Sequence, residues 1–268
     1  MDPSLLIGIL IAFGGLLAMI TLEGAHVSAL LLPAPMVLVF GATIAIGIAG
    51  GTVADAREAV RALPRAFRGL GGSSQDLIDK VVGYAETARM QGLLALENAV
   101  ADEKDPFVRQ ALQNIADGTD ADELRIVLED QVASTAGRRR TAARFFSTLG
   151  GYAPTVGIVG TVVSLTHVLE KLDQPDTLGP LIAAAFVATL WGLLSANFIW
   201  LPIGTRLQRL AEIEIDRMTL LTEGLLAVQS GSPPHLVSER MRALSPEPLG
   251  KPGRKSGKKA PETADESV

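Results

Sequence analysis

The sequence predicts an all-α integral membrane protein with four transmembrane helices. A helical cytoplasmic domain lies between the second and third of them, and helical extensions lead to a disordered C-terminal tail. Two observations carry this prediction. First, 48% of the residues are hydrophobic and 20% are charged, with a positive mean hydropathy, so apolar and charged residues occupy separate blocks. Second, four apolar blocks are long enough, or nearly so, to cross a bilayer.

The four apolar blocks follow one another as candidate spans. Leu5–Leu22 holds 18 residues without a charge, or roughly 27 Å of helix. Pro35–Gly51 is the second and is short, Tyr152–Val168 is the third and the most polar, and Leu181–Ile203 is the fourth. A cleaved signal peptide is the alternative for the first block. However, no Lys or Arg precedes it and a second apolar block follows at once.

The placement of basic residues predicts the orientation. Of the 24 Lys and Arg residues, all but Lys171 lie between the second and third blocks or after the fourth. Because basic residues accumulate in cytoplasmic loops, both termini are expected in the cytoplasm. The external segments are then short, one around His26 and one at Glu170–Gly179.

Between and after the spans, apolar residues recur at helical spacing. We expect helix breaks near 69–73 and 117–119, with Ser73 and Asp76 spaced as a helix start. The end of the chain is rich in Pro, Lys, Gly and Ser, which is typical of disorder. The expected units are 1–51 (first hairpin), 52–148 (cytoplasmic domain), 149–203 (second hairpin), 204–244 (helical extension) and 245–268 (tail).

Several functions lack their sequence signals. The chain has no cysteine, which excludes disulfides and thiolate chemistry. Its net charge is −5 without a basic, aromatic-rich face, so no nucleic-acid partner is expected. HExxH and GxSxG motifs are absent, and the GLGGSS stretch lacks the Gly-Lys-Ser/Thr of a phosphate loop. We therefore expect no enzyme, no cofactor, and no catalytic or metal-binding residues.

The third and fourth spans each carry a stripe of small and hydroxylated residues on one helical face. The stripes are Pro154, Gly157, Thr161 and Ser164, and Ala185, Thr189, Gly192 and Ala196. One interpretation is close helix packing, which small residues permit. The other is the wall of a narrow hydrated path, in which hydroxyls and the carbonyl freed by Pro154 replace water around a cation. Both interpretations can hold together.

A cation path also needs an ionisable group near the middle of the membrane. None of the four spans has one at its centre. If the path exists, a partner chain has to supply an Asp or Glu.

Several blocks resemble flagellar stator subunits of the MotA/TolQ/ExbB proton channel family. They include TARMQGLLALE, YAPTVGIVGTVVSLTHVLEKL and LGPLIAAAFVATLWGLLSANFIWLPI, and the resemblance runs from Leu5 to about Leu244. It implies a homo-pentamer in the bacterial inner membrane, surrounded by lipid. The ring would enclose a dimer of MotB, whose single transmembrane helix brings the ion-carrying Asp. Transported H⁺ or Na⁺ would rotate the ring, and its cytoplasmic domains would act on the rotor switch protein FliG.

By position, Pro154 matches a family proline tied to coupling, and Pro202 matches the proline at the inner end of the fourth span. Thr189 matches the threonine beside the ion path. The resemblance assigns Arg89 and Glu97 to the rotor contact, whereas a solvated helix face is the alternative for this pair.

Two further positions bear on the ion. Thr161 lies seven residues after Pro154, where sodium-driven relatives tend to have threonine, and Asn197 also matches a sodium-type position. Two other functions remain open: an energising subunit of the TolQ or ExbB type, and a non-conducting membrane scaffold. The TolQ and ExbB proteins lack the N-terminal hairpin, which favours the stator.

Overall fold

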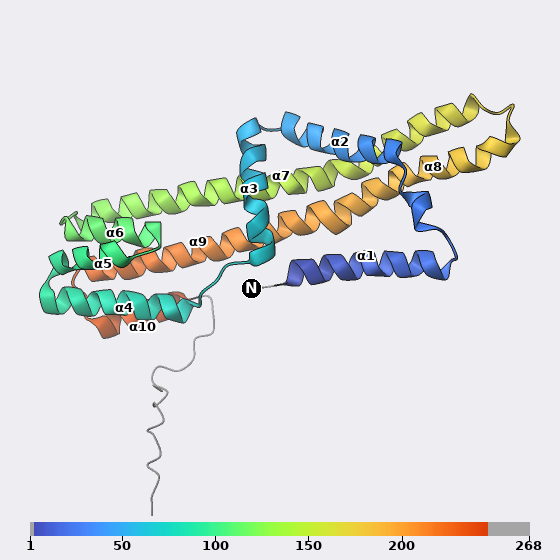
Figure 1. Cartoon of the computed structure of the whole chain (residues 1–268). Coiled ribbons are helices and arrows are strands. Elements are labelled where there is room, and N and C mark those ends of the chain that lie inside the picture. The colour runs from blue at the N-terminus through green and yellow to red at the C-terminus, as the bar shows by residue number, and fades with distance from the viewer. Residues whose placement is uncertain (1–2, 246–268) are drawn as a thin grey trace, which may run out of the picture.

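The computed structural model describes residues 3–245, and all regular structure in this range is helical (Figure 1). The predicted all-α class is confirmed. Two long rods lie antiparallel and side by side. One is α7 (Ala121–Leu169), and the other is α8 (Pro175–Leu194), a π-helical segment (Ser195–Trp200) and α9 (Leu201–Gln229) in succession. The 49 residues of α7 span about 74 Å, more than twice the hydrocarbon core of a bilayer.

Each rod therefore has a membrane half and a half outside the membrane. The membrane half also carries α1 (Ser4–Leu22) and α2 (Pro33–Ala49), joined through a 3-10 turn at Val27–Leu30. By length and composition, α1, α7 and the α8–α9 rod qualify as membrane spans, whereas α2 is shorter, at 17 residues. A crossing by α2, and with it the count of four, stays a prediction. The Trp191 indole donates a 2.7 Å hydrogen bond to the Leu30 carbonyl, which ties the α1–α2 connection to α8.

Two helices begin earlier than predicted. α8 begins at Pro175, so the external connection is shorter than the expected Glu170–Gly179, and α2 begins at Pro33 rather than Pro35. In both cases a proline stands in the first turn, where its missing N–H has no helical partner to lose. The sequence analysis places the start of each helix where its apolar run begins. The first turns of α2 and α8 contain proline or polar residues and lie before those runs.

The half outside the membrane is completed by α4 (Ser74–Gln91), α5 (Glu97–Asp102), α6 (Pro106–Ala116) and α10 (Pro234–Leu244). They pack on the ends of α7 and α9 around a core of large aliphatic side chains. Its fully buried members include Ile78, Leu112, Leu124, Leu225 and Met241. Gly224 lets α10 approach α9 closely, because an added Cβ there would lie 2.5 Å from the Met241 sulfur.

The predicted breaks at 69–73 and 117–119 are confirmed, and Gly118 turns the chain with a φ of 80°. The predicted start at Ser73 is also confirmed. Its hydroxyl accepts a 3.2 Å hydrogen bond from the Asp76 N–H, and the Asp76 carboxylate accepts one from the Ser73 N–H. The predicted tail 245–268 lies outside the described residues, apart from Ser245.

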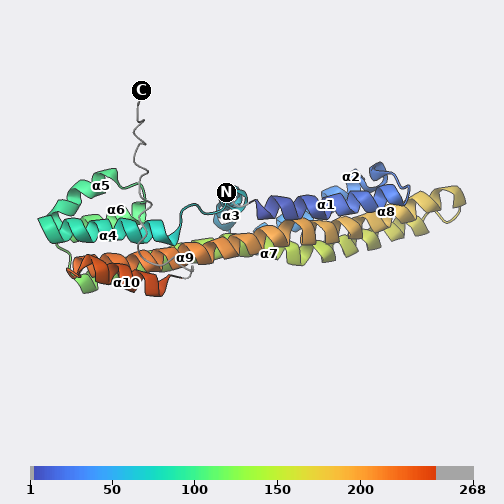
Figure 2. The same cartoon turned by 90° about the horizontal axis from the view of Figure 1, so that it is seen from below.

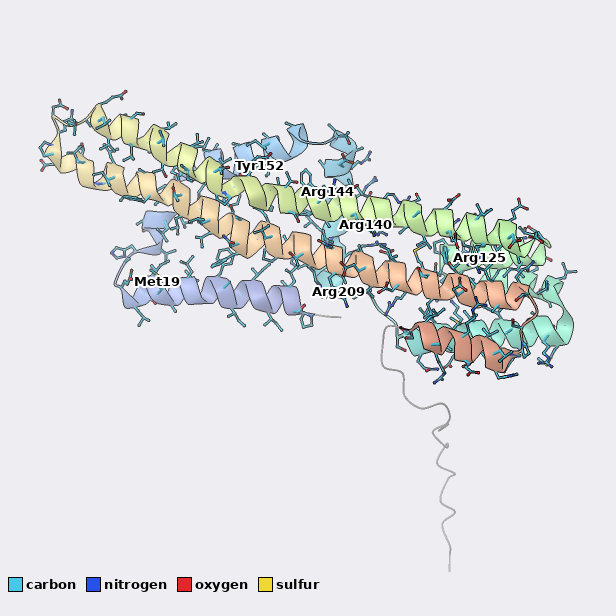
Figure 3. All side chains as sticks on the ribbon, turned by 180° about the vertical axis from the view of Figure 1, so that it is seen from behind. Met19, Arg125, Arg140, Arg144, Tyr152 and Arg209 are labelled. Atoms are coloured by element: carbon cyan, nitrogen blue, oxygen red, sulfur yellow. The ribbon has the colours of Figure 1, made fainter. Side chains whose placement is uncertain are left out.

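Between the two halves, α3 (Val53–Arg68) runs across the rods rather than along them (Figures 1 and 2). It packs on a second core that contains Leu5, Phe146, Leu149 and Ile203. Figure 3 shows Arg140, Arg144 and Arg209 on one side of Tyr152, and the membrane half of α7 on the other. The core beneath α3 therefore lies where the apolar parts of the two rods end and their arginine-bearing parts begin.

Candidate functional site

The two small-residue stripes meet where α7 crosses α8. A Cβ added to Gly157 would lie 2.8 Å from the Ala188 carbonyl oxygen and 3.2 Å from the Gly192 Cα. A Cβ added to Gly192 would lie 2.7 Å from the Ala153 carbonyl oxygen. The helices thus approach until backbone touches backbone, as the packing interpretation requires.

Beside this contact, the structure brings Thr161 and Thr189 together. Their hydroxyl groups hydrogen-bond to each other across the interface. The Thr161 Oγ1 also lies 3.2 Å from the Gly157 carbonyl oxygen and 3.0 Å from the Ala185 carbonyl oxygen. Both threonines are half-buried. Four neutral oxygens from two helices therefore converge at one point, which we call the hydroxyl site.

The hydroxyl site can coordinate a cation but cannot neutralise it. Hydroxyl and carbonyl oxygens are hard ligands of the kind that replace water around a cation such as Na⁺. The sequence has no Asp, Glu, Lys or Arg from Tyr152 to Leu169 or from Thr177 to Thr205. Within residues 3–245, no group of three or more His, Asp or Glu residues could hold a metal ion. A cation crossing here needs a countercharge from outside this helix pair.

Pro154 lies inside α7, two turns from Thr161 and on the same helical face. It has no N–H to donate, so the Gly150 carbonyl loses its helical partner. The helix nevertheless continues without a break through this position. Pro154 is half-buried and therefore belongs to the packed side of α7.

Pro202 and Asn197 lie at the other end of α8. Pro202 is the second residue of α9. Because proline has no N–H, the Phe198 carbonyl lacks its α-helical hydrogen-bond donor, which helps to explain the wider π-helical segment before Pro202. Asn197, within that segment, is exposed and donates a 2.9 Å hydrogen bond to the Leu193 carbonyl. The structure therefore does not bring Asn197 to the hydroxyl site. The sequence reading missed the π-helical segment, although Pro202 predicts that one helical bond is lost there.

Arg89 and Glu97 lie at the far end of the half outside the membrane. Arg89 is in the last turn of α4 and Glu97 begins α5, with a turn at Gly92 between them. Both side chains are exposed. In the described part of the chain no hydrogen bond or ion pair joins them. This geometry suits a docking surface and a solvated helix face equally well.

The sequence reading missed a buried carboxylate, Glu103, in the same half. Only 1% of its side chain is exposed, and Lys80 Nζ lies 2.6 Å from it. The Tyr84 hydroxyl donates to it at 2.6 Å, and the Asp105 N–H at 2.8 Å. Burial alone would raise the pKa of Glu103, but hydrogen bonds from Lys80, Tyr84 and the Asp105 N–H, together with the positive charge of Lys80, lower it. Burial, together with the hydrogen bond to Glu103, raises the pKa of Tyr84.

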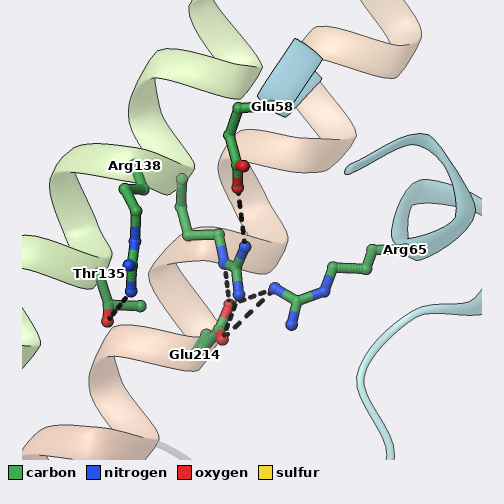
Figure 4. Close-up of polar contacts among 6 residues, drawn as sticks. Glu58, Arg65, Thr135, Arg138 and Glu214 are labelled. Atoms are coloured by element: carbon green, nitrogen blue, oxygen red, sulfur yellow. Dashed lines mark hydrogen bonds and ion pairs between the residues drawn. The ribbon is translucent and has the colours of Figure 1, made fainter. Parts of the chain in front are cut away.

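A second ionic cluster ties α3 to both rods (Figure 4). Arg139 of α7 lies 2.8 Å from Glu214 of α9 and 3.6 Å from Glu58 of α3. Arg65 of α3 lies 3.3 Å from the same Glu214. No sequence pattern pairs these residues, because they come from three elements far apart in the chain.

Comparison with known proteins defines the class. The family model for the N-terminal region of motility protein A matches residues 6–91, and the model for the MotA/TolQ/ExbB proton channel family matches residues 99–219. The chain belongs to the MotA/TolQ/ExbB proton channel family.

Within this family, the chain is similar to motility protein A of Bacillus subtilis, with 32% identity over 251 residues and 92% of each chain covered. Its fold matches the flagellar MotAB stator complex from Bacillus subtilis with a TM-score of 0.82 and 32% identity, over 89% of this chain and 94% of that one. The structure of C. jejuni MotAB matches in fold, with a TM-score of 0.87 and 24% identity, over 91% of this chain and 96% of that one.

Proposed function

We propose that this chain is the stator subunit of a bacterial flagellar motor. With a MotB partner it forms a complex that conducts cations across the membrane and converts their flow into torque on the rotor. The observation that carries the proposal is the match to motility protein A and to a flagellar stator complex at 32% identity over about nine-tenths of the chain. The match of the N-terminal model to residues 6–91 supports the stator over a TolQ- or ExbB-like energiser.

The hydroxyl site is our candidate for this chain's part of the ion pathway. It supplies neutral oxygens, and the partner supplies the acid that carries the ion. The uncharged runs Tyr152–Leu169 and Thr177–Thr205 support this division, because an ion path through them alone would have no countercharge. We place five copies of the chain around two MotB copies in the bacterial inner membrane. Both termini lie in the cytoplasm, as the positions of 23 of the 24 Lys and Arg residues favour.

Na⁺ is our proposed coupling ion, with H⁺ as the alternative. The convergence of Thr161 and Thr189 with two backbone carbonyls supports Na⁺, because a sodium ion needs several oxygen ligands at once. Swimming speed measured against Na⁺ concentration at fixed pH distinguishes the two ions. One charge moved through 100 mV releases about 2.3 kcal/mol, so each ion can drive only a small rotation step.

The cytoplasmic half transmits the motion in this proposal. Arg89 and Glu97 would contact the rotor switch protein FliG, which their exposure and lack of internal partners support. Neither residue is used to hold the fold together, so both remain available to a partner.

A non-conducting scaffold is the second candidate. It is favoured by one observation: the hydroxyls of Thr161 and Thr189 already find their hydrogen bonds within the α7–α8 pair. In a scaffold these bonds would serve packing alone.

Thr189→Val tests the proposed function against the scaffold. Valine keeps the shape of threonine but removes one oxygen from the hydroxyl site, so we expect normal assembly and loss of motility. The control is Thr222→Val, because the buried Thr222 hydroxyl bonds only to the Met218 carbonyl of its own helix, in the cytoplasmic half. That variant should swim. Swimming of Thr189→Val at the normal speed would favour the scaffold.

A further inference from the structure

The surface of α3 that faces away from the protein has two parallel stripes. At about 100° per residue, Ala59, Ala62 and Ala66 point toward the rods, where all three are buried. On the outer side, Val53, Val60 and Pro64 form an apolar stripe, and all three are exposed. A basic stripe formed by Arg57, Arg61 and Arg68 runs beside it, and these are exposed as well.

The arginines of the basic stripe have no partner in the described part of the chain. The two acids of α3 are both engaged elsewhere. Asp55 accepts a 2.9 Å hydrogen bond from the Thr52 N–H in the N-terminal cap of the helix. Glu58 pairs with Arg139. Three positive charges therefore remain unbalanced on the outer side of one helix.

The apolar stripe lies on the side of α3 that is nearer to the spanning helices, and the basic stripe lies on the opposite side. On the flank beside the apolar stripe, Leu63 and Phe67 pack into the core that includes Leu5, in the first turns of α1. The flank beside the basic stripe carries Arg65, which reaches Glu214, more than two turns beyond the end of the apolar part of the rod. The apolar stripe thus lies on the membrane side, and the basic stripe lies nearer to the cytoplasm.

α3 also lies at the depth of a bilayer surface. It follows α2 after three residues and runs across the rods where the spanning segments end (Figures 1 and 2). A helix in this orientation, with apolar residues below and arginines above, has the pattern of an interfacial amphipathic helix.

We propose that α3 is a binding site for anionic phospholipid headgroups. Arg57, Arg61 and Arg68 bind the headgroup phosphates, while Val53, Val60 and Pro64 lie against the upper acyl chains. Guanidinium groups pair with phosphate oxygens, and basic residues at a membrane surface prefer anionic lipid. The proposal requires that the apolar helices cross a membrane and does not depend on the motor function.

A single labelled cysteine tests the site, because the natural chain has none. A fluorophore is attached to Val60→Cys in the full-length chain, reconstituted in vesicles. Quenching by brominated phosphatidylglycerol is compared with quenching by brominated phosphatidylcholine. We expect quenching by both lipids, with a relative binding constant several times higher for the anionic one. Gln91→Cys, on the exposed end of α4, should be quenched by neither.

Charge variants identify the groups responsible. Arg61→Gln should lower the preference for phosphatidylglycerol by up to about fivefold, and Arg61→Lys should keep most of it. Arg65→Gln removes the same charge one turn away, from a side chain that pairs with Glu214, and should change the preference less than Arg61→Gln does. If both lipids quenched the label equally in the Val60→Cys chain without an arginine substitution, the proposal would be overturned. So would a label that neither lipid quenches, as when a second copy of the chain covers α3.

Discussion

The same two rods are held together by different forces at their two ends. In the membrane half, α7 and α8 meet through Gly157 and Gly192, with two hydroxyls and no charge at the contact. In the other half, leucines of α7 and α9 pack into one core, and ion pairs reinforce the contact. Lipid offers no hydrophobic gain for helix association, so close backbone contact takes its place. In water, apolar burial stabilises the contact.

This difference predicts how each end responds to substitution. The membrane contact has no spare volume, so a small added group is expected to disrupt it. The half outside the membrane should instead be sensitive to the loss of buried partners, and tolerant of changes on its surface.

The largest effect is expected from Gly157→Leu. Its side chain would have to occupy space held by the backbone at Ala188 and Gly192, so α7 and α8 cannot keep their crossing. We expect no assembled complex on size-exclusion chromatography and no motility.

Gly137→Leu is the matched control on the same helix. A Cβ on Gly137 meets nothing within 4 Å, and the position is exposed. Leucine is also a better helix former than glycine. This variant should assemble normally. Equal yields of complex from the two variants would contradict the close-contact account of the membrane half.

An intermediate effect is expected from Glu103→Gln. The change leaves Lys80 without its carboxylate and weakens the bond from Tyr84. We expect the free energy of unfolding of the half outside the membrane to fall by about 1–3 kcal/mol, measured by chemical denaturation. Asp102→Asn, at the exposed neighbouring position, should change it by less than about 0.5 kcal/mol. A similar small change from both variants would mean that the buried contacts of Glu103 contribute little.

The pH dependence of this difference has a definite sign. The pKa of Glu103 is lower in the folded chain than its usual value of 4.5. The ionised Glu103 carboxylate therefore contributes fully to the free energy of unfolding above pH 4.5, and this contribution is lost as the pH falls through the folded-state pKa. The unchanged chain and Glu103→Gln should differ most near neutral pH and converge in acid. If the difference in the free energy of unfolding between the two chains grew as the pH fell, the folded chain would raise the pKa of Glu103 rather than lower it.

The smallest effect on stability is expected from Arg89→Glu. The side chain is exposed and has no described partner, so stability should change by less than about 0.5 kcal/mol and membrane insertion should be normal. Torque at high load, measured on tethered cells, should fall if Arg89 contacts the rotor. Unchanged torque would leave Arg89 as a solvated surface charge.

Local rules predicted the features that depend on a single helix. The periodicity of α7 and α8 placed Thr161 and Thr189 on their small-residue faces, and the structure brings those faces together. The capping pair at Ser73 and Asp76 predicted a helix start correctly. The pattern left close packing and an ion path both open, and the resemblance assigned Thr189 to the path.

Features that depend on several elements could not be predicted. Glu103 lies in a polar run, and its contacts with Lys80 and Tyr84 of α4 form only when the chain folds. The Arg139–Glu214 pair joins residues 75 positions apart. Asn197 stays a prediction for the ion path. The structure places it on the exposed side of its π-helical segment, and helical periodicity cannot anticipate that register.

Ion flux into sealed vesicles tests the central claim most directly. The claim is that this chain supplies neutral oxygens and the partner supplies the acid. Vesicles with this chain alone should take up Na⁺ and H⁺ no faster than empty vesicles. Vesicles that also contain the partner should conduct, and conduction should stop when the partner's membrane Asp is replaced by Asn. Transport at the full rate by this chain alone would contradict the account.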